Sequence, residues 1–327
     1  MVFALATLLS ALLCGIYLWW ARRLQLLAEP DHRSSHSAPT PHGGGVGLIC
    51  AFVISLLLLQ SFQGQWHSAY LVLAGCAVLL MLLGILDDLR GLAIAPRLLL
   101  YLLISLASAA WLLQPLWSMG AGQALVLTFI AALGLLSLLN IYNFMDGIDG
   151  IAALQAIVAG AAAAVIASAA GAPALYVGAC GLLAACHLGF LLWNWPPAKM
   201  FMGDAGSVAT GYLLGALALL GAVQGYLPLA CWLVLLAVFI TDAGWTLAWR
   251  IVTGQRFTEP HRMHAYQRLS RRWGSHLKVD VLLLFITLTW SVPIAWAVHA
   301  NPDHALFLVI LAYLPLLGFM AKMRSMT

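Results

Sequence analysis

The amino-acid sequence predicts an all-α fold, a polytopic integral membrane bundle with about eleven transmembrane helices. Hydrophobic residues make up 63% of the 327-residue chain and charged residues only 8%, and the mean hydropathy is +0.97. This composition is typical of membrane-spanning proteins. Apolar runs long enough to cross about 30 Å of hydrocarbon as helices recur along the chain. No strand-length segments with alternating polar and apolar residues indicate a β-barrel. We therefore expect one membrane-embedded domain over residues 1–327.

Short polar or glycine-rich segments separate the predicted spans. The first span has no basic segment before it and two arginines after it, which indicates a retained anchor rather than a cleaved signal peptide. The second begins at the glycines 43–45, the third ends in Asp87 and Asp88, and the fifth ends at Asn140. The expected ranges are 2–20, 43–61, 68–86, 98–113, 123–140, 151–170, 174–193, 207–223, 228–246, 279–299 and 305–321.

The basic residues fix the expected orientation. All 15 lysines and arginines fall in loops on one side of the predicted bundle, and the loops on the other side carry none. The loops without Lys or Arg are the segments 63–67, 114–122, 170–173, 224–226 and 300–304. Because Lys and Arg favour cytoplasmic loops, we expect the N-terminus outside and the C-terminus in the cytoplasm.

The acidic residues follow the same division, although topology does not require acids. Of the 11 Asp and Glu residues, only Asp303 is expected on the outer side. A carboxylate at the centre of a bilayer costs roughly 2.5–3.5 kcal/mol on insertion scales, so acids at span ends either reach water or serve a site. Acids in four separate loops on one face favour a site.

One such segment is the run NIYNFMDGIDG, in which Asn140, Asn143, Asp146 and Asp149 stand three apart. If the run is helical, these side chains project within about half of the helix circumference. Two amides and two carboxylates facing one way suit a divalent cation together with a nucleotide.

A second segment, LLGILDDLRGL, ends the third span in Asp87 and Asp88. Neighbouring helical residues point about 100° apart, so at most one of the two is expected to touch a reacting group. The alternative is a pair at a span end that is balanced by Arg90 and water.

A third segment, NWPPAKMFMGDAGS, places Asp204 between glycines just before a new span. The following helix N-terminus would favour anions there. Lys199 and the large ring of Phe201 lie nearby in sequence. Asp204 could instead be a helix-capping acid, and Phe201 could pack at the membrane interface.

Two longer loops carry most of the remaining polar residues. EPDHRSSHSAPTPHGGGVG could bind an anion through Arg33, His36 and glycine amides, or it could be a polar connector. FTEPHRMHAYQRLSRRWGSH and its flanks, residues 247–278, hold seven of the 15 Lys and Arg residues around His261 and His264. This second loop could cover a phosphate-rich ligand or lie as an amphipathic helix on anionic headgroups.

With these residues in place, the chain resembles the polyprenyl-phosphate N-acetylhexosamine-1-phosphate transferases. This family contains the undecaprenyl-phosphate GlcNAc-1-phosphate transferases and the phospho-MurNAc-pentapeptide translocases. The resemblance covers nearly the whole chain through five motifs in the family's order: PTPHGGGVG at 39–47, the Asp87–Asp88 pair, NIYNFMDGIDG, PAKMFMGDAGS and the His-containing last loop.

RSSH at 33–36 and HAYQRL at 264–269 resemble the branch that initiates O-antigen or other surface polysaccharides. The wider family commonly has a cluster such as HIHH or HHH in the last loop, where this chain has His264 followed by Ala265, Tyr266 and Gln267. Only His264 carries over directly. The departure suggests changed recognition of the sugar nucleotide and argues against peptidoglycan-precursor transfer.

The resemblance implies transfer of an N-acetylhexosamine-1-phosphate from a UDP-sugar to undecaprenyl phosphate, with release of UMP. The reaction would take place at the cytoplasmic face of the bacterial inner membrane and use Mg²⁺, with Mn²⁺ able to replace it. We expect the lipid bilayer and a homodimer as partners and no nucleic acid. Which N-acetylated sugar is used stays open, as does the choice between direct attack and a covalent intermediate.

The resemblance also implies roles for individual residues. Asp204 is the expected Mg²⁺ ligand, supported by Asn143 or Asp146, and the catalytic set is Asp87, Asp88 and Asp204. The expected substrate-binding residues are Asn140, Asp149, Asn194, Lys199, Phe201, Arg33, His36, His264 and Arg268. Asp242 is a secondary candidate, either structural or supporting the site.

Two other functions fit parts of the sequence. A secondary transporter would bind ions at acids near the bilayer midplane, in discontinuous spans and internal repeats. The sequence indicates acids at one face, with neither interrupted spans nor repeats. A noncatalytic scaffold of a polysaccharide assembly complex would not need four acid-bearing loops on one side.

Overall fold

The computed structural model describes residues 1–23, 27–28, 40–64, 66–255 and 261–325. The α-helices in this part of the chain are α1 Val2–Arg23, α2 Gly45–Phe62, α3 Ser68–Arg90, α4 Ile94–Leu112, α5 Ala121–Met145, α6 Ile151–Ala169, α7 Ala174–Asn194, α8 Asp204–Val223, α9 Leu229–Leu235, α10 Ala237–Val252, α11 Ala265–Trp273, α12 His276–Ile286, α13 Val292–Ala300 and α14 Ala305–Ser325. A π-helical turn, η2 Thr287–Ser291, joins α12 to α13. Two short 3-10 helices, η1 Gln114–Met119 and η3 Pro302–His304, lie in loops. The two-residue strands β1 Leu27–Ala28 and β2 Thr40–Pro41 pair antiparallel.

The predicted membrane bundle is confirmed. Ten helices in the described residues are long and apolar enough to cross a membrane, and α9 with α10 makes an eleventh crossing if the pair is one span. This pair bends by 74°. The expectation of an uninterrupted span at 228–246 was therefore wrong, because the helix breaks at Leu236 between the two parts.

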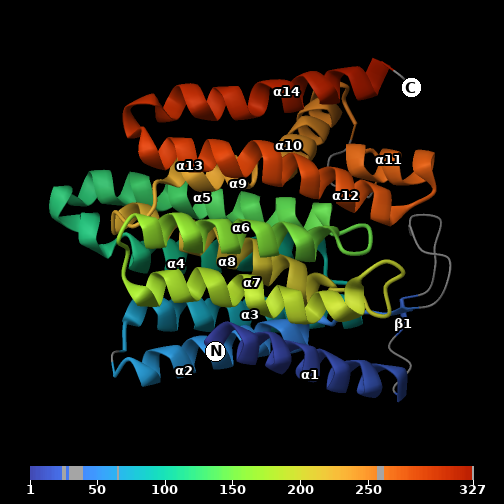
Figure 1. The fold of residues 1–327 in the computed structure, drawn as a ribbon, viewed down its shortest axis with the longest axis horizontal. Helices are drawn as coiled ribbons and strands as arrows, with labels where there is room; N and C mark the ends of the chain where they lie inside the picture. Colours follow the sequence, from blue (N-terminus) through green and yellow to red (C-terminus); the bar gives the residue numbers. More distant parts are fainter. Residues whose placement is uncertain (24–26, 29–39, 65, 256–260, 326–327) are drawn as a thin grey trace.

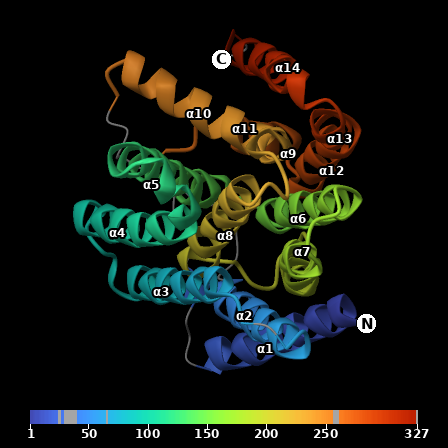
Figure 2. The same cartoon turned by 90° about the vertical axis from the view of Figure 1, so that its left-hand side faces the viewer.

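The long helices run side by side, and the loops that connect them lie at the two ends of the bundle (Figure 1). In the view of Figure 2, α8 lies at the centre of the bundle, between the pair α6 and α7 and the helices α3, α4 and α5. Together, α7 and α8 are the most buried of the spanning helices in the described chain. The two residues that follow Asp204, Ala205 and Gly206, are therefore deep in the packing at one end of α8.

Small residues let three helices meet at this end of the bundle. A Cβ atom added to Gly45 at the start of α2 would lie only 2.1 Å from the Cα of Gly206 in α8. A Cβ on Gly84 in α3 would lie 2.3 Å from the backbone nitrogen of Ala205. Glycine permits such close backbone approach because it has no side chain. The contacts bring the acidic end of α3 beside the beginning of α8.

We expect Gly45→Ala to destabilise the bundle, because the added methyl group cannot fit without moving α2 away from α8. Overpacking of this kind costs about 1–3 kcal/mol. The apparent melting temperature in detergent should fall. The matched control is Gly75→Ala in α3, where an added Cβ meets no atom within 4 Å. Equal melting temperatures for the two variants would contradict the close packing of α2 on α8.

Candidate active site

Several loops between helices lie at the end of the bundle that carries β1 and the C-terminus (Figure 1). We call this end the charged end. At this end, backbone hydrogen bonds join the segment 41–45 to the segment 200–203. The amide of Phe201 donates to the carbonyl of Pro41, and the amide of Gly44 donates back to the carbonyl of Phe201, both at 2.9 Å. Two motifs far apart in the sequence are thus one structural unit.

Carboxylates from two helices lie beside this junction. Asp87, near the end of α3, accepts a hydrogen bond from the amide of Leu92 at 2.7 Å and forms an ion pair with Arg97 of α4. The Arg97 guanidinium also lies 3.5 Å from the carboxylate of Asp204, the first residue of α8. Arg97 therefore stands between two acids, and no Arg90 contact is needed to balance Asp87.

The neighbouring acid, Asp88, points to different partners, as expected for adjacent helical residues. Its Oδ1 accepts a long hydrogen bond from the amide of Asp204 at 3.4 Å. Its Oδ2 is buried without a hydrogen-bond partner in the described chain, and the Nδ1 of His42 lies 3.7 Å away. The Asp88 carboxylate raises the pKa of the His42 imidazole above its ordinary value.

Two residues at the end of α5 complete this group, which we call the carboxylate cluster: Asp87, Asp88, Asp146 and Asp204 with Asn143. Asn143 donates to Asp204 at 3.3 Å and accepts from the hydroxyl of Ser207 at 2.7 Å. Burial raises the pKa of Asp146 well above its ordinary value, and the negative charges of Asp204 and Asp88 raise it further. The carboxylates of this acidic cluster therefore repel one another.

The four polar residues of the run 140–149 do not share one helical face, so that expectation was wrong. Helix α5 ends at Met145, and Asp146 already has non-helical backbone angles. Asn140 donates to the carbonyl of Leu136 in its own helix. Asn143 contacts Asp204, and Asp146 lies close enough to Asp204 and Asp88 to interact electrostatically with them, whereas Asp149 makes a separate set of contacts.

Asp149 is held by two other segments. Its Oδ2 accepts from the amide of Ala198 at 3.0 Å and lies 3.2 Å from Nδ1 of His276 in α12. Asn194 is buried nearby, where it accepts from the amide of Gly150 at 2.9 Å and donates to the carbonyl of Met200 at 3.0 Å. Its side-chain amide therefore joins the loop that carries Gly150 to the loop that carries Met200.

An open cleft of about 560 Å³ lies beside Asp149. Its other lining residues are Pro196, Pro197, Arg262, Ser270, Arg271, Gly274, Ser275, His276 and Leu277. Two guanidinium groups and an imidazole line the cleft together with one carboxylate, which makes it suited to a polar ligand that carries negative charge.

The last basic loop is anchored by Asp242 of α10. This carboxylate accepts from the amides of Ala265 and Tyr266 at 2.9 and 3.0 Å, and it lies 3.3 Å from Nδ1 of His264. It thereby caps the N-terminus of α11 from another helix. The hydroxyl of Tyr266 donates to the carbonyl of Phe144 at 2.8 Å, which ties α11 to the end of α5. Asp242 thus anchors α11 and also lies beside His264, a predicted substrate-binding residue.

The other predicted site residues that the structure describes make contacts outside the carboxylate cluster. His264 is buried and stacked against the rings of Phe144 and Tyr266. Arg268 donates to the carbonyl of Met323 at 2.7 Å. Lys199 is exposed, with its ammonium 6.0 Å from the ring centre of Trp193. Phe201 is half-buried in the junction. Arg33 and His36 lie outside the described residues.

His261, whose ring lies 5.0 Å from that of His264, is also partly buried. Its pKa is lowered to about 4 by burial and by the nearby imidazole of His264 and guanidinium of Arg250. Its imidazole is therefore neutral near pH 7, so His261 adds no positive charge to the loop there.

Sequence reasoning missed several contacts of the site. Arg97, Ser207 and His276 were not proposed as site residues, although each touches one that was. His42 stands inside the PTPHGGGVG motif, and that position was a usable signal. Arg97 was counted only as a topological charge, and only the fold brings it to Asp87.

The donor atoms of the carboxylate cluster fit Mg²⁺. In the described chain, no three His, Cys, Asp or Glu side chains are already arranged around a metal position. Mg²⁺ is usually bound by one or two carboxylates with water and substrate phosphates rather than by a full protein cage. The unpartnered buried Oδ2 of Asp88, the nearby Asp204 carboxylate and the amide oxygen of Asn143 are hard ligands of the required kind.

These features define a class: a polytopic helical membrane protein with an acidic, phosphate-compatible site at one end of the bundle. Residues 70–222 match the family described as glycosyl transferase family 4. The stretch contains the whole carboxylate cluster, Arg97 and Asp149.

The chain is also similar to individual proteins of known name. It is 35% identical over 104 residues to a probable undecaprenyl-phosphate N-acetylglucosaminyl 1-phosphate transferase of Bacillus subtilis, which covers 31% of this chain and 29% of that protein. It is 59% identical over 51 residues to a phospho-N-acetylmuramoyl-pentapeptide-transferase of Synechococcus, covering 16% and 14%. A protein of the same name from Rhodopseudomonas palustris is 45% identical over 64 residues, covering 20% and 16%. The matched stretches span less than a third of these relatives.

We expect Asp242→Ala to release α11 from α10, because two backbone amides lose their charged acceptor. Hydrogen bonds to a charged group contribute about 1.5–3 kcal/mol each. Trypsin should then cleave faster at Arg271 and Arg272 in α11. The control is Thr246→Val, which removes only a 3.4 Å contact to the same carboxylate. Cleavage as slow as in the wild type would rule out the capping role.

Proposed function

We propose that this protein transfers an N-acetylhexosamine-1-phosphate from a UDP-sugar to undecaprenyl phosphate and releases UMP. The family of residues 70–222 and the names of the similar proteins support a polyprenyl-phosphate hexosamine-1-phosphate transferase. The single observation that carries the proposal is the carboxylate cluster with Arg97, assembled from α3, α4, α5 and α8 at one end of a membrane bundle.

The proposed reaction occurs at the cytoplasmic face of the bacterial inner membrane. All 15 Lys and Arg residues are assigned by sequence to one side, which is cytoplasmic by the positive-inside rule. The N-terminus is then outside and the C-terminus inside. At that face the site meets a soluble nucleotide sugar from one direction and a lipid phosphate from the other.

In the proposed reaction, an oxygen of the lipid phosphate attacks the β-phosphorus of the UDP-sugar. A new phosphorus–oxygen bond forms, the bond between the β-phosphorus and the UMP oxygen breaks, and UMP leaves. A phosphate monoester has a second pKa near 6, so the acceptor is mostly dianionic at pH 7 without a protein base. Direct attack therefore needs no covalent enzyme intermediate.

Asp87 has an orienting role in this proposal. Both of its oxygens already accept hydrogen bonds, one from Leu92 and one from Arg97. It therefore holds the Arg97 guanidinium, which lies within reach of Asp204 and can pair with a phosphate oxygen. The positive charge offsets the repulsion between the phosphates of donor and acceptor.

Mg²⁺ is the proposed cofactor, with Mn²⁺ able to replace it. Asp204 would hold the ion, with Asn143, Asp146 and Asp88 in support. A divalent ion supplies neutralisation of the charge on the phosphoryl oxygens during transfer. Without the ion, these acids would repel the donor, which agrees with a metal requirement.

The donor side of the proposal lies around Asp149 and the adjoining cleft. Asp149 and Phe201 are proposed near the nucleotide, and Asn194 fixes the two loops that present them. The weaker proposed contacts are Asn140, Lys199, Arg33, His36, His264 and Arg268. The resemblance of 264–269 to surface-polysaccharide enzymes supports a role in initiating O-antigen or a related polymer. A homodimer remains part of the proposal.

The transporter alternative is not favoured. The discontinuous pair α9 and α10 is the kind of feature a transporter uses, but its acid, Asp242, is engaged in capping α11. The acids of the carboxylate cluster lie at helix ends rather than at the middle of the bundle.

The first test measures UMP release by purified protein with undecaprenyl phosphate and a panel of UDP-N-acetylhexosamines, with and without Mg²⁺. We expect release that requires lipid and metal. Asp204→Asn should lower kcat at least about 100-fold, a loss comparable to removing one electrostatic stabiliser of a transition state. The control Asp303→Asn, at the other end of the bundle, should keep wild-type activity. No release with any donor would reject the proposed function.

A second test separates the two roles considered for Asp87. If Asp87 holds Arg97, Asp87→Asn should lower kcat by the same factor at pH near 6 and at pH near 8.5, with the wild type measured at each pH. A base that deprotonates the lipid phosphate would matter less at high pH, where the phosphate is already dianionic. A clearly smaller loss at high pH would therefore support the base role and contradict the orienting role.

A further inference from the structure

Asp280 is a buried acid that the proposed chemistry does not use. It lies one turn into α12, and it is only 1% exposed. Both of its carboxyl oxygens are buried without a hydrogen-bond partner in the described part of the chain. A buried carboxyl group without partners is costly because it has lost its hydration. Such a group calls for an explanation other than fold stability.

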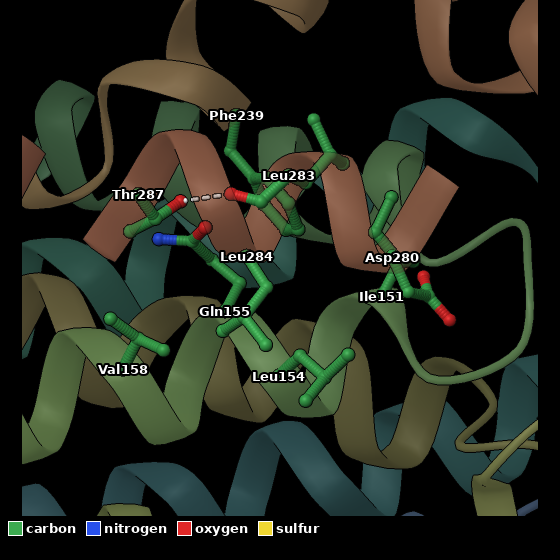
Figure 3. A pocket seen from close by; sticks show the side chains of 9 residues that line it. All are labelled: Ile151, Leu154, Gln155, Val158, Phe239, Asp280, Leu283, Leu284 and Thr287. Atoms are coloured by element: carbon green, nitrogen blue, oxygen red, sulfur yellow. Dashed lines mark hydrogen bonds between the residues drawn. The ribbon is translucent and has the colours of Figure 1, made fainter. Parts of the chain in front are cut away.

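The cavity that Asp280 lines offers it no hydrogen-bond donor. This cavity lies between α6, α10 and α12 and holds about 10 Å³, room for a single water molecule at most. Its other polar side chains are already engaged: Gln155 donates to the carbonyl of Leu235 and Thr287 to that of Leu283, both at 2.8 Å. Figure 3 shows the Asp280 carboxylate at the far end of the cavity from Thr287.

On its other side, Asp280 packs against the loop between α5 and α6, which carries Asp149 and Gly150. A Cβ atom on Gly150 would lie 2.8 Å from Oδ2 of Asp280. Gly150 also has a φ of +80°, a conformation that favours glycine. Asp280 therefore touches the backbone of the residue that follows Asp149.

His276 links Asp280 to the Asp149 carboxylate. It precedes Asp280 by one turn of α12, so both side chains lie on the same face of the helix. Its Nδ1 lies 3.2 Å from Oδ2 of Asp149. Asp280 is near enough to interact electrostatically with both His276 and Asp149. Asp280 therefore lies behind the imidazole whose Nδ1 faces Asp149, and it makes no hydrogen bond to that imidazole in the described chain.

We propose that Asp280 is a positioning residue for recognition of the nucleotide-sugar donor: through His276 it fixes the orientation of the Asp149 carboxylate at the cleft. Asp149 and His276 line that cleft, whereas Asp280 lies behind them in the separate cavity. The inference rests on the proposed transferase function, since it assigns the cleft beside Asp149 to the donor.

The test uses steady-state UMP release by the purified full chain with Asp280→Asn. The donor is the UDP-N-acetylhexosamine that the wild type turns over. We expect KM for this donor to rise about tenfold, which corresponds to about 1.4 kcal/mol of donor binding. The kcat value and KM for undecaprenyl phosphate should stay within about twofold, because the carboxylate cluster is untouched. The melting temperature should not fall, because the variant removes a carboxylate that has no partner.

A double variant tests the proposed route through His276. His276→Gln alone should raise KM for the donor by a similar factor, and Asp280→Asn combined with His276→Gln should raise it no further than the larger single effect. Residues that act through one contact are not additive, whereas independent residues multiply their effects. Thr287→Val is the matched control, since it changes the same cavity without removing a charge, and its kinetic constants should equal those of the wild type.

The outcomes separate this inference from the proposed function. If the wild type releases UMP but Asp280→Asn keeps the donor KM, Asp280 has no positioning role. The same conclusion follows if kcat and both KM values worsen together with a lower melting temperature, or if the double variant multiplies the single effects. If the wild type releases no UMP with any donor, the proposed function fails and this inference fails with it.

Discussion

Mutual repulsion among the four acids of the carboxylate cluster is the constraint on which the charged end depends. Close packing of α8 on α2 and α3, through glycines and Ala205, forces Asp204 beside Asp88 and near Asp87. Arg97 and His42 offset only part of that charge. The tight packing of these helices keeps the acids close together. The negative charge that is not offset makes the site attractive to cations. The same contacts therefore determine both the fold of this end and the negative charge of the site.

The helices were largely predictable because the bilayer imposes a simple rule: each crossing needs a long apolar run with its backbone groups paired internally. The errors lie where polar residues continue a helix or where an apolar run bends. Helix α5 continues beyond the predicted end at residue 140 to Met145, and α3 reaches Arg90. The break at Leu236 lies within an apolar run, and hydropathy carries no signal for a change of direction.

The site was predictable in its residue types but not in its pairings. Spacing indicated Asp87, Asn143 and Asp204, since polar residues at span ends need a reason to be there. Which cation faces which acid depends on contacts between helices distant in the sequence. The partnership of Asp87 with Arg97, and that of Asp149 with His276 across 127 positions, follow from the tertiary packing alone.

The bend between α9 and α10 also affects how the protein meets its solvent. Helix α10 turns away from the bundle and leaves Leu247, Ile251 and Val252 exposed by 39%, 57% and 80%. These side chains lie on the helix whose Asp242 anchors the last basic loop. This apolar surface is suited to contact lipid, so the last basic loop is anchored to a helix that depends on lipid as well as on protein. Purification that strips annular lipid changes the support of that loop, and short-chain detergents replace a structural partner as well as a solvent.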